Sequence, residues 1–444
     1  MKLFKTKYTW VITTLVLAIG YFVSCTKDDQ VLDLPVVSNG TELYAEKITT
    51  APTIDGTIDA MWDNATKLNF TVAMPDPGNG LFAGYQGLSY NGTIRSMYDN
   101  QYIYFLAEIP DADKNHKASP WYFDPITNRW NKEPGSRTLD ANGNLLREGY
   151  GKDQFAMLWN IDQSTPKFAT QTCYSSCHIF TPYLDYATTP AVYKANNSGN
   201  HYTNAQSEKI DQWWAHPERG LVFGNMDDNY QDWAGGPTVV NLAGGNGNGR
   251  HFDDLIPNGT FSTTWPYRPN YTADATQGSF SNTQNLRLDG LLANALVAVP
   301  LWVIPNSTSD YIKIADTAVG GTAVKITGVS STGVLTYSGG SIDPNVGTDY
   351  QRLGTTPTSA IGAKCFPSVI LSPVKNGRAD ITMTAVHNGT YWIYEFKRLL
   401  KTGDTLKQDV DFSSLNDQPF GIAVFEKSNY QHALKPNLVL KFKK

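Results

Sequence analysis

Apolar and polar residues alternate in several stretches of the chain, and this pattern predicts β-strands. Residues 102–106 (Tyr-Ile-Tyr-Phe-Leu) follow a turn at 98–101, and residues 391–396 and 438–443 alternate in the same way. Residues 154–161 form an almost continuous apolar run, which is typical of a buried strand. Short strands separated by turn signals favour antiparallel pairing.

Turn residues divide the rest of the chain. An Asp-Gly pair within residues 54–59 predicts a hairpin or a bulged strand, and residues 324–337 read as a second hairpin. Residues 181–290 are rich in Asn, Gly, Asp, Tyr and Trp, a composition typical of functional loops. Residues 305–365 resemble an insertion. We therefore expect an all-β fold, a single antiparallel β-sandwich with long loops at one end.

Composition agrees with this fold class. The 444 residues include 37 Gly, 24 Pro and 12% aromatic residues, whereas charged residues reach only 17%. Soluble domains usually contain about 25% charged residues, and coiled coils contain more. The net charge of −5 argues against a nucleic-acid partner, because nucleic acids require a basic face.

The N-terminus has the pattern of a targeting segment. Lys2, Lys5 and Lys7 precede an apolar run at 10–23 that ends beside Cys25. The run is shorter than the ~20 residues that span a membrane. It resembles a bacterial lipoprotein signal, in which the Cys becomes the lipidated N-terminus. The alternative is an uncleaved N-terminal anchor.

Residues 26–29 (Thr-Lys-Asp-Asp) resemble the signals that send lipoproteins of the Bacteroidetes to the cell surface, although they could equally be a plain tether. We expect a signal peptide at 1–24, a tether at 25–42 and one domain at 43–444. The mature protein would be anchored to the outer membrane by a lipid on Cys25, facing the periplasm or the cell surface.

Cys173, Cys177 and His178 form a C-x-x-x-C-H motif, one residue longer than the C-x-x-C-H signature of covalent haem attachment. In that chemistry two thiols add to the two vinyl groups of the porphyrin, and the His that follows is placed under the iron. Two alternatives remain open. The cysteines could form a disulfide, or they could bind zinc together with Cys365 and a distant ligand.

The order of several segments resembles the haem-binding domain of the gamma subunits of ethylbenzene dehydrogenase-type enzymes (type II dimethyl sulfoxide reductases) and its c-type cytochrome branch. These segments are residues 54–62, 153–159, 172–178, 211–228 and 392–425, with Thr172 in the place of a family Gly. The resemblance implies a sandwich that holds haem in loops at one end. The gamma subunits bind haem b through Met and Lys, whereas Cys173, Cys177 and His178 imply one covalent haem c.

The resemblance also directs the search for the second iron ligand. The family Lys corresponds to a position near His432, with Lys435 as the family-like substitute. His216 and Met226 are rival ligands. Trp213 and Trp214 are expected to wall the haem pocket, although both could instead be ordinary core residues.

Asp227 and Asp228 follow this Trp pair. Together they could bind Ca²⁺ through hard oxygens, but no third oxygen ligand is regularly spaced nearby, so we expect a structural role.

Two functions follow from these features. The first is a lipid-anchored c-type cytochrome that exchanges electrons with a redox partner protein. The second is a surface glycan-binding module with a Cys173–Cys177 disulfide. The chain contains no Gly-rich phosphate loop, nucleophile elbow or zinc-protease His pair, so we expect no enzymatic activity.

Overall fold

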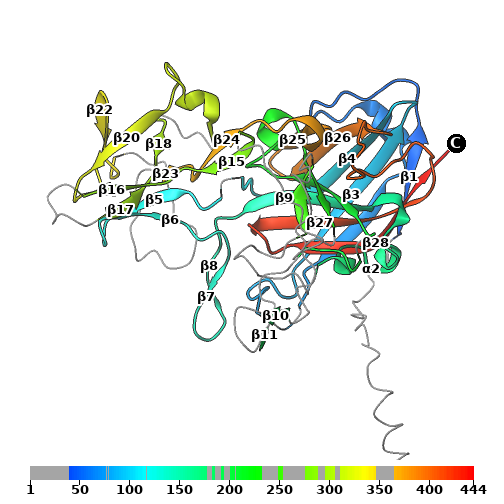
Figure 1. Ribbon diagram of the computed structural model, residues 1–444, viewed down its shortest axis with the longest axis horizontal. Helices are drawn as coiled ribbons and strands as arrows, with labels where there is room; N and C mark the ends of the chain where they lie inside the picture. Colours follow the sequence, from blue (N-terminus) through cyan, green and yellow to red (C-terminus); the bar gives the residue numbers. More distant parts are fainter. Residues whose placement is uncertain are drawn as a thin grey trace, which may run out of the picture. The chain divides into compact units, whose positions relative to one another are not determined.

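Strands dominate the described part of the chain. The computed structural model describes residues 40–76, 78, 80–116, 118–177, 183–185, 192–194, 201–205, 207–232, 249–253, 276–288, 296–305, 311–346 and 365–444. The prediction of an all-β fold is confirmed (Figure 1). The predicted signal peptide (1–24), most of the tether (25–42) and His178 lie outside the described residues.

One 12-stranded sheet forms the main body. Its strands, in spatial order, are β14 (Arg250–Phe252), β13 (Asp227–Gln231), β12 (Ile210–Ala215), β9 (Lys152–Asn160), β27 (Gln418–Ser428), β28 (Ala433–Phe442), β1 (Glu42–Lys47), β3 (Ser89–Tyr98), β4 (Tyr102–Pro110), β26 (Tyr391–Leu399) and β25 (Thr382–His387). The remaining strand, β2 (Leu68–Ala73), pairs with β28 and β3.

The expectation of a purely antiparallel sheet is wrong in one respect. Strand β1 runs parallel to both of its neighbours, β28 and β3. Two-residue hairpins connect only antiparallel strands, so a strand that inserts between distant segments is free to take either direction.

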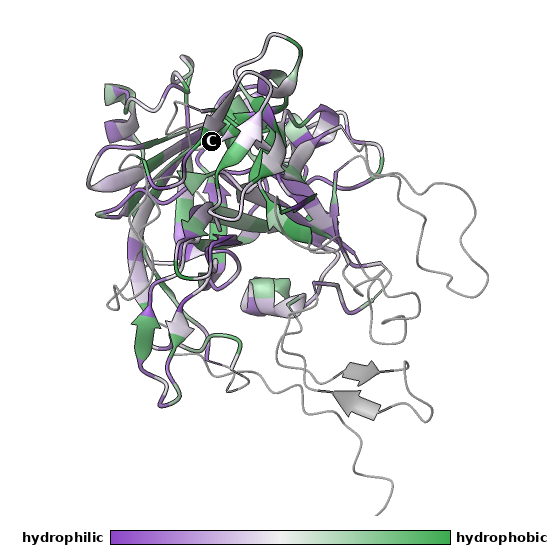
Figure 2. Ribbon diagram, turned by 90° about the vertical axis from the view of Figure 1, so that its left-hand side faces the viewer, coloured by the Kyte–Doolittle hydropathy of each residue, from purple (hydrophilic) through white to green (hydrophobic). Residues whose placement is uncertain are grey.

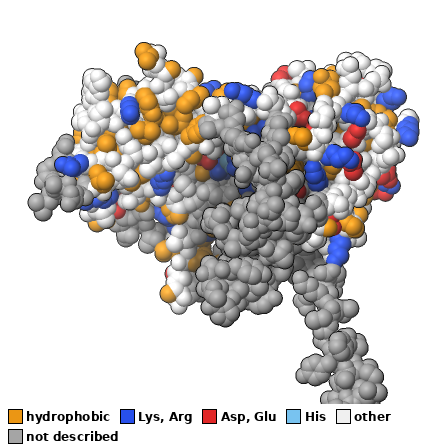
Figure 3. All heavy atoms as spheres, in the orientation of Figure 1, with side chains coloured by type: hydrophobic (Ala, Val, Ile, Leu, Met, Phe, Trp, Pro, Cys, Tyr) orange, Lys and Arg blue, Asp and Glu red, His pale blue; other side chains and the backbone are white. Residues whose placement is uncertain are grey.

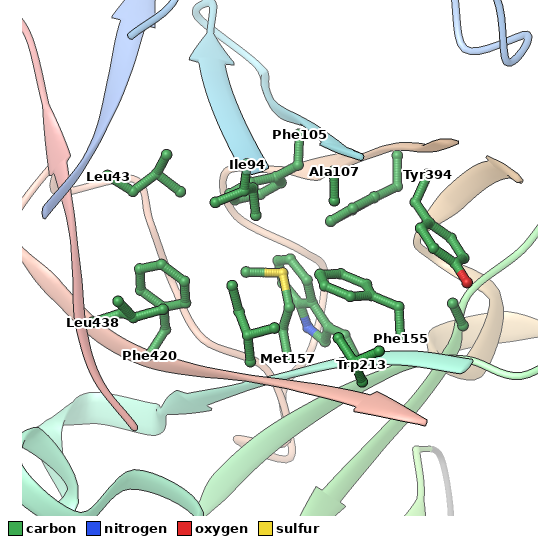
Figure 4. Close-up of a cluster of buried hydrophobic side chains, with 14 of the residues drawn as sticks. Leu43, Ile94, Phe105, Ala107, Phe155, Met157, Trp213, Tyr394, Phe420 and Leu438 are labelled. Atoms are coloured by element: carbon green, nitrogen blue, oxygen red, sulfur yellow. The ribbon is translucent and has the colours of Figure 1, made fainter. Parts of the chain in front are cut away.

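The two halves of this sheet face each other across the main hydrophobic core (Figure 4). Phe105 of β4 lies 5.9 Å, between ring centroids, from Trp159 of β9 and equally far from Trp213 of β12. The strands β4 and β9 are not neighbours in the sheet, so these contacts fold it into a sandwich. Each large apolar side chain buried in this way contributes about 1.5–3 kcal/mol.

The local patterns located several strands of the main sheet correctly. The turn at 98–101 joins β3 to β4, and the runs at 154–161, 391–396 and 438–443 fall on β9, β26 and β28. Both hydrophobic and hydrophilic residues occur along the strands of the protein (Figure 2).

The predicted opening hairpin is wrong. Residues 54–59 form no strand, and they lead into the 3₁₀ helix η1 (Ala60–Asn64). Glu395 of β26 accepts the Nε1–H of Trp62 at 3.2 Å and the backbone N–H of Gly56 at 2.8 Å. The Glu395 carboxylate, more than 300 residues away, therefore accepts the hydrogen bonds of this segment in place of a partner strand.

Six small sheets accompany the main sheet in the described residues. They are β23 (Cys365–Phe366) with β5 (Trp121–Asp124) and β6 (Arg129–Lys132); β18 (Trp302–Val303) with β20 (Val324–Val329), β21 (Leu335–Tyr337) and β22 (Gly340–Ile342); β15 (Gly278–Ser281) with β24 (Val369–Ser372) and β19 (Ile312–Lys313); β16 (Gln284–Arg287) with β17 (Leu296–Val299); β7 (Thr138–Leu139) with β8 (Leu145–Arg147); and β10 (Tyr183–Asp185) with β11 (Val192–Lys194). The hairpin predicted at 324–337 is confirmed as β20–β21.

A second hydrophobic cluster lies among these small sheets. It includes Trp121 and Trp130 as well as Ile326 and Leu335, so it draws on residues both inside and outside the predicted insertion at 305–365.

Helices are short. The described helices are α2 (Phe168–Gln171) and the 3₁₀ helices η1, η2 (Ile161–Gln163), η3 (Thr172–Ser175), η4 (Leu221–Phe223), η5 (Ile314–Thr317) and η6 (Asn376–Ala379). No described helix is long and apolar enough to cross a membrane. Lys and Arg side chains are interspersed with Asp and Glu side chains on part of the face shown in Figure 3.

Candidate functional site

The segment that carries the two cysteines is clamped onto the main sheet. Thr172 is buried and has a φ of +46°, in the left-handed region that favours Gly. Its hydroxyl donates to the carbonyl of Phe168 (3.2 Å) and accepts the N–H of Asn437 (2.9 Å). A Cβ on Gly421 of β27 would lie 2.3 Å from Cγ2 of Thr172, so only Gly allows this close approach.

Cys173 and Cys177 are one helical turn apart. The N–H of Cys177 donates to the carbonyl of Cys173 at 2.8 Å, which closes a single i→i+4 turn. Residues four apart on such a turn share a face, so the extra residue of C-x-x-x-C keeps both sulfurs on one side. Cys173, Cys177 and Cys365 are all thiols in the structure. Burial and the neighbouring Cys177 raise the pKa of the Cys173 thiol.

The two tryptophans of β12 lie on opposite faces of the sheet. Trp213 is fully buried in the main core beside Met157 and Phe155 (Figure 4). Trp214 faces the other way and forms a small cluster with Ala156 and Phe425. Because strand side chains alternate, the expectation that both rings wall one pocket is wrong. The strands β12 and β13 also show that part of 181–290 is regular sheet.

Cationic side chains surround Trp214. The guanidinium carbons of Arg219 and Arg250 lie 4.8 and 4.9 Å from its ring centroid. Nε1 of Trp214 is buried and has no hydrogen-bond partner among the described residues. A guanidinium also pairs well with carboxylates such as haem propionates. Sequence reasoning did not assign Arg250 to the site, because it lies on β14 and nothing local connects it to β12.

Asp227 is held in this cationic cluster. Its carboxylate accepts from Arg219 (2.7 Å) and Arg378 (2.5 Å). Burial opposes ionisation of Asp227, but the two guanidiniums outweigh it and hold the pKa below its usual value. Asp227 therefore has a structural role.

His432 lies in the turn between β27 and β28. Its ring is 4.6 Å from that of Phe425, which in turn stacks on Trp214 at 5.9 Å. Nδ1 lies 2.7 Å from the carbonyl oxygen of Tyr430. A carbonyl only accepts, so Nδ1 carries the proton and Nε2 carries the lone pair, as in His residues that bind metals. Burial lowers the pKa of His432, and nearby Arg250 lowers it further, which favours this neutral imidazole.

Arg250 connects His432 with the cysteine turn. It interacts electrostatically with Cys177 as well as with His432. Sequence positions 177 and 432 thus both lie near Arg250, and Cys177 also belongs to the main hydrophobic cluster.

The rival ligands have other surroundings. His216 is buried; its Nδ1 accepts the N–H of Glu218 (3.2 Å), and its Nε2 lies 3.2 Å from Nζ of Lys152. Burial and neighbouring cations, Lys152 foremost, lower the pKa of His216 well below its usual value. Met226 lies in the main core with no exposure. Lys435 is buried on β28, and burial lowers its pKa.

The described residues fit a covalent haem. Two thiols share one turn, His432 and Cys177 both interact with Arg250, and Nε1 of Trp214, against which Arg250 packs, has no partner among these residues. Thiols and imidazole are the donors that haem c uses.

The comparisons with known proteins concern the family and the fold. The sequence profile of a family described as "Ethylbenzene dehydrogenase" matches residues 59–435. The chain has no significant match among curated proteins. Two solved structures of a carbohydrate binding module family 9 from Caldicellulosiruptor kristjanssonii, with glucose and with cellotriose, cover 90% of this chain at 8% identity. The matches include 95% and 93% of those two solved chains, and the TM-scores are 0.26 and 0.24. Similarity at this level carries no argument for sugar binding.

The profile match also corrects one expectation. It covers most of the chain and carries the description of a dehydrogenase, which points to an enzyme-related, redox family. The expectation of no enzymatic activity is therefore wrong. Its basis was the lack of familiar catalytic motifs, and a redox protein does not need those motifs, because a cofactor carries the chemistry.

Proposed function

Because the chain belongs to the ethylbenzene dehydrogenase family, we propose that it is the electron-transferring, haem c-carrying component of a dehydrogenase-type redox system. Cys173 and Cys177 would hold one haem covalently, with His178 and His432 as axial ligands. The bound iron supplies a one-electron redox centre.

The convergence of the cysteine turn and His432 on Arg250 carries this proposal. The donor groups are far apart in sequence, and the His432 ring lies against Phe425, which stacks on Trp214. In this arrangement the carbonyl of Tyr430 orients the His432 ring through Nδ1–H. Arg219 and Arg250 supply positive charge for the carboxylate groups of the porphyrin.

Cellular location is part of the same proposal. Lipidation of Cys25 would tether the protein at the outer membrane, facing the periplasm or the cell surface, where a redox partner protein exchanges electrons with it. Haem attachment through two thiols also gives an odd set of cysteines a use outside the cytoplasm.

The test is a visible spectrum of the full chain, produced in a host competent for covalent haem attachment. We expect haem absorption that survives acid-acetone extraction. Cys173→Ala/Cys177→Ala should abolish it, whereas the matched control Cys365→Ala should keep it. A colourless, folded wild-type protein from this host would overturn the proposal.

The second ligand is tested on the same material. His432→Ala should change the spin state of the bound haem, because one axial position opens. His387→Ala on β25 is the control and should leave the spectrum unchanged. An unchanged spectrum in His432→Ala, together with a change in Lys435→Ala, would assign the position to Lys435 instead.

A further inference from the structure

An acidic pocket lies on the opposite side of β13 from the arginine cluster, which consists of Arg219, Arg250 and Arg378 around Trp214 and Asp227. The cavity has a volume of about 310 Å³, and Asp253, Asp380 and Asp409 line it. Behind these residues lie Asp211 and Asp228, both with no exposure. One carboxylate oxygen each of Asp211, Asp228 and Asp409 lies within 4.8 Å of the other two.

Among the described residues, Arg398 forms ion pairs with three of these five carboxylates, and Lys209 interacts electrostatically with Asp253. Nη1 of Arg398 lies 2.9 Å from Asp211, 3.7 Å from Asp409 and 3.9 Å from Asp228. Arg398 is itself fully buried, against the ring of Trp213. Five carboxyl groups therefore converge where few cations compensate them, and buried acidic groups are rarely left without compensation.

Several buried oxygens around the pocket also accept no hydrogen bond from an N–H group of the described residues. Oδ1 of Asp253 is one of them, in a residue only 5% exposed that enters the pocket from the end of β14. Oδ2 of Asp228 and both carboxylate oxygens of Asp380 likewise accept no N–H group of the described residues. Buried acceptors are nearly always satisfied, so oxygens of this kind from three separate segments point to a ligand between them.

We propose that this acidic pocket binds one Ca²⁺ ion through the carboxylates of Asp228, Asp253, Asp380 and Asp409. The Arg398–Asp211 ion pair forms the wall behind the ion. Ca²⁺ takes six to eight oxygen ligands in flexible geometry, which suits carboxylates from four separate segments, with water completing the shell. Mg²⁺ requires a stricter octahedron, and softer metals prefer imidazole or thiolate.

The ion would join four segments that lie far apart in the sequence. Asp228 belongs to β13, Asp253 follows β14, Asp380 follows η6, and Asp409 lies in the loop between β26 and β27. The same β13 carries Asp227 into the arginine cluster, so the ion would also stiffen the support of that cluster. The calcium proposal does not rest on haem binding.

A second acidic cluster shows the difference between a satisfied site and an unsatisfied one. Asp111, Asp153 and Glu426 also bring their oxygens within 4.8 Å. Asp153, however, accepts three N–H groups, from Asn115 (2.6 Å), Trp392 (3.0 Å) and Lys427 (3.2 Å). Backbone and indole donors thus satisfy Asp153, and Nζ of Lys427 lies 3.6 Å from the carboxylate of Glu426.

Calcium titration of the chelator-treated full chain tests the proposal. We expect one binding event by calorimetry, a higher melting temperature with Ca²⁺, and Tb³⁺ luminescence sensitised by Trp213. Asp253→Asn/Asp380→Asn should weaken binding by roughly tenfold or more, because two of four charged ligands become neutral. Asp162→Asn, which removes a surface carboxylate, should bind like the wild type.

Two outcomes would overturn the calcium site. One is a folded wild-type protein that shows neither binding heat nor a change in melting temperature, which would mean that shared protons neutralise the cluster. The other is unchanged affinity in the double variant. Haem absorbance recorded on the same samples separates failure of this site from failure of haem attachment.

Discussion

The two faces of the β12–β13 hairpin have opposite chemistry, although their residues alternate along the same two strands. On one face Trp214 and Asp227 lie among guanidiniums. On the other face Trp213 packs in the core, and Asp228 belongs to a group of carboxylates. The register pairs Trp213 with Asp228 and Trp214 with Asp227, so each face receives one of each.

This difference shows that two identical residues next to each other in the sequence can have different roles. A Trp-Trp or Asp-Asp pair looks like one feature in a sequence, but a period of two sends its members to separate environments. The proposed haem site uses one face and the proposed calcium site uses the other.

Among the variants that compare the two faces, removal of Arg398 should lower the free energy of unfolding most. Arg398→Met leaves Asp211 and its acidic neighbours without their buried cation, and breaking such a pair typically costs about 3–5 kcal/mol. Chemical denaturation measures the free energy of unfolding. Arg250→Met on the other face is the matched control and should cost less than about 1 kcal/mol, because other cations remain there. Equal losses would contradict the distinction between the faces.

The two tryptophans allow a direct test of the same distinction. Trp213→Ala opens a cavity in the main core and should cost about 3–5 kcal/mol. Trp214→Ala removes a small cluster and two cation–π contacts, for which we expect about 1–2 kcal/mol. Denaturation of both variants side by side is the measurement. If Trp214→Ala were the more costly change, the assignment of core and site faces would be wrong.

A smaller effect is expected in the pH dependence of the free energy of unfolding, and it arises from the second acidic cluster (Asp111, Asp153 and Glu426). Burial, followed by the charge of Asp111, raises the pKa of Asp153 to about 7. Burial, followed by the charge of Asp153, raises the pKa of Glu426 to about 9. Both pKa values exceed those of the unfolded chain, near about 4, so the folded state keeps protons that the unfolded state has released. The free energy of unfolding should therefore fall as pH rises from about 4 through these values.

Glu426→Gln tests this dependence, because Gln resembles the protonated acid. The variant should be more stable than the wild type near pH 8, with a shallower slope, since each retained proton contributes up to about 1.4 kcal/mol per pH unit. Denaturation at several pH values, with chelator present, gives both slopes. Parallel curves for variant and wild type would contradict the assignment.

Sequence patterns located the features that depend on residues close together in the chain, namely individual strands and the cysteine turn. The alternation at 102–106 and 391–396 predicted β4 and β26, because side chains two apart share a face whatever the strand pairs with. The spacing of Cys173 and Cys177 pointed to two thiols used together, and a single turn does hold them on one side. The prediction of an opening hairpin was wrong because the hydrogen-bond partner of this segment, Glu395, lies far away in the sequence.

By itself, the sequence determined that the chain is built of strands, and it supplied the cysteine pair and the donor residues of both proposed sites. Only the tertiary structure decided which face each residue occupies and that Asp211, Asp228, Asp253, Asp380 and Asp409 converge. The physical reason is register: pairing between strands hundreds of residues apart sets which side chains meet, and a shift of one residue would exchange the two faces.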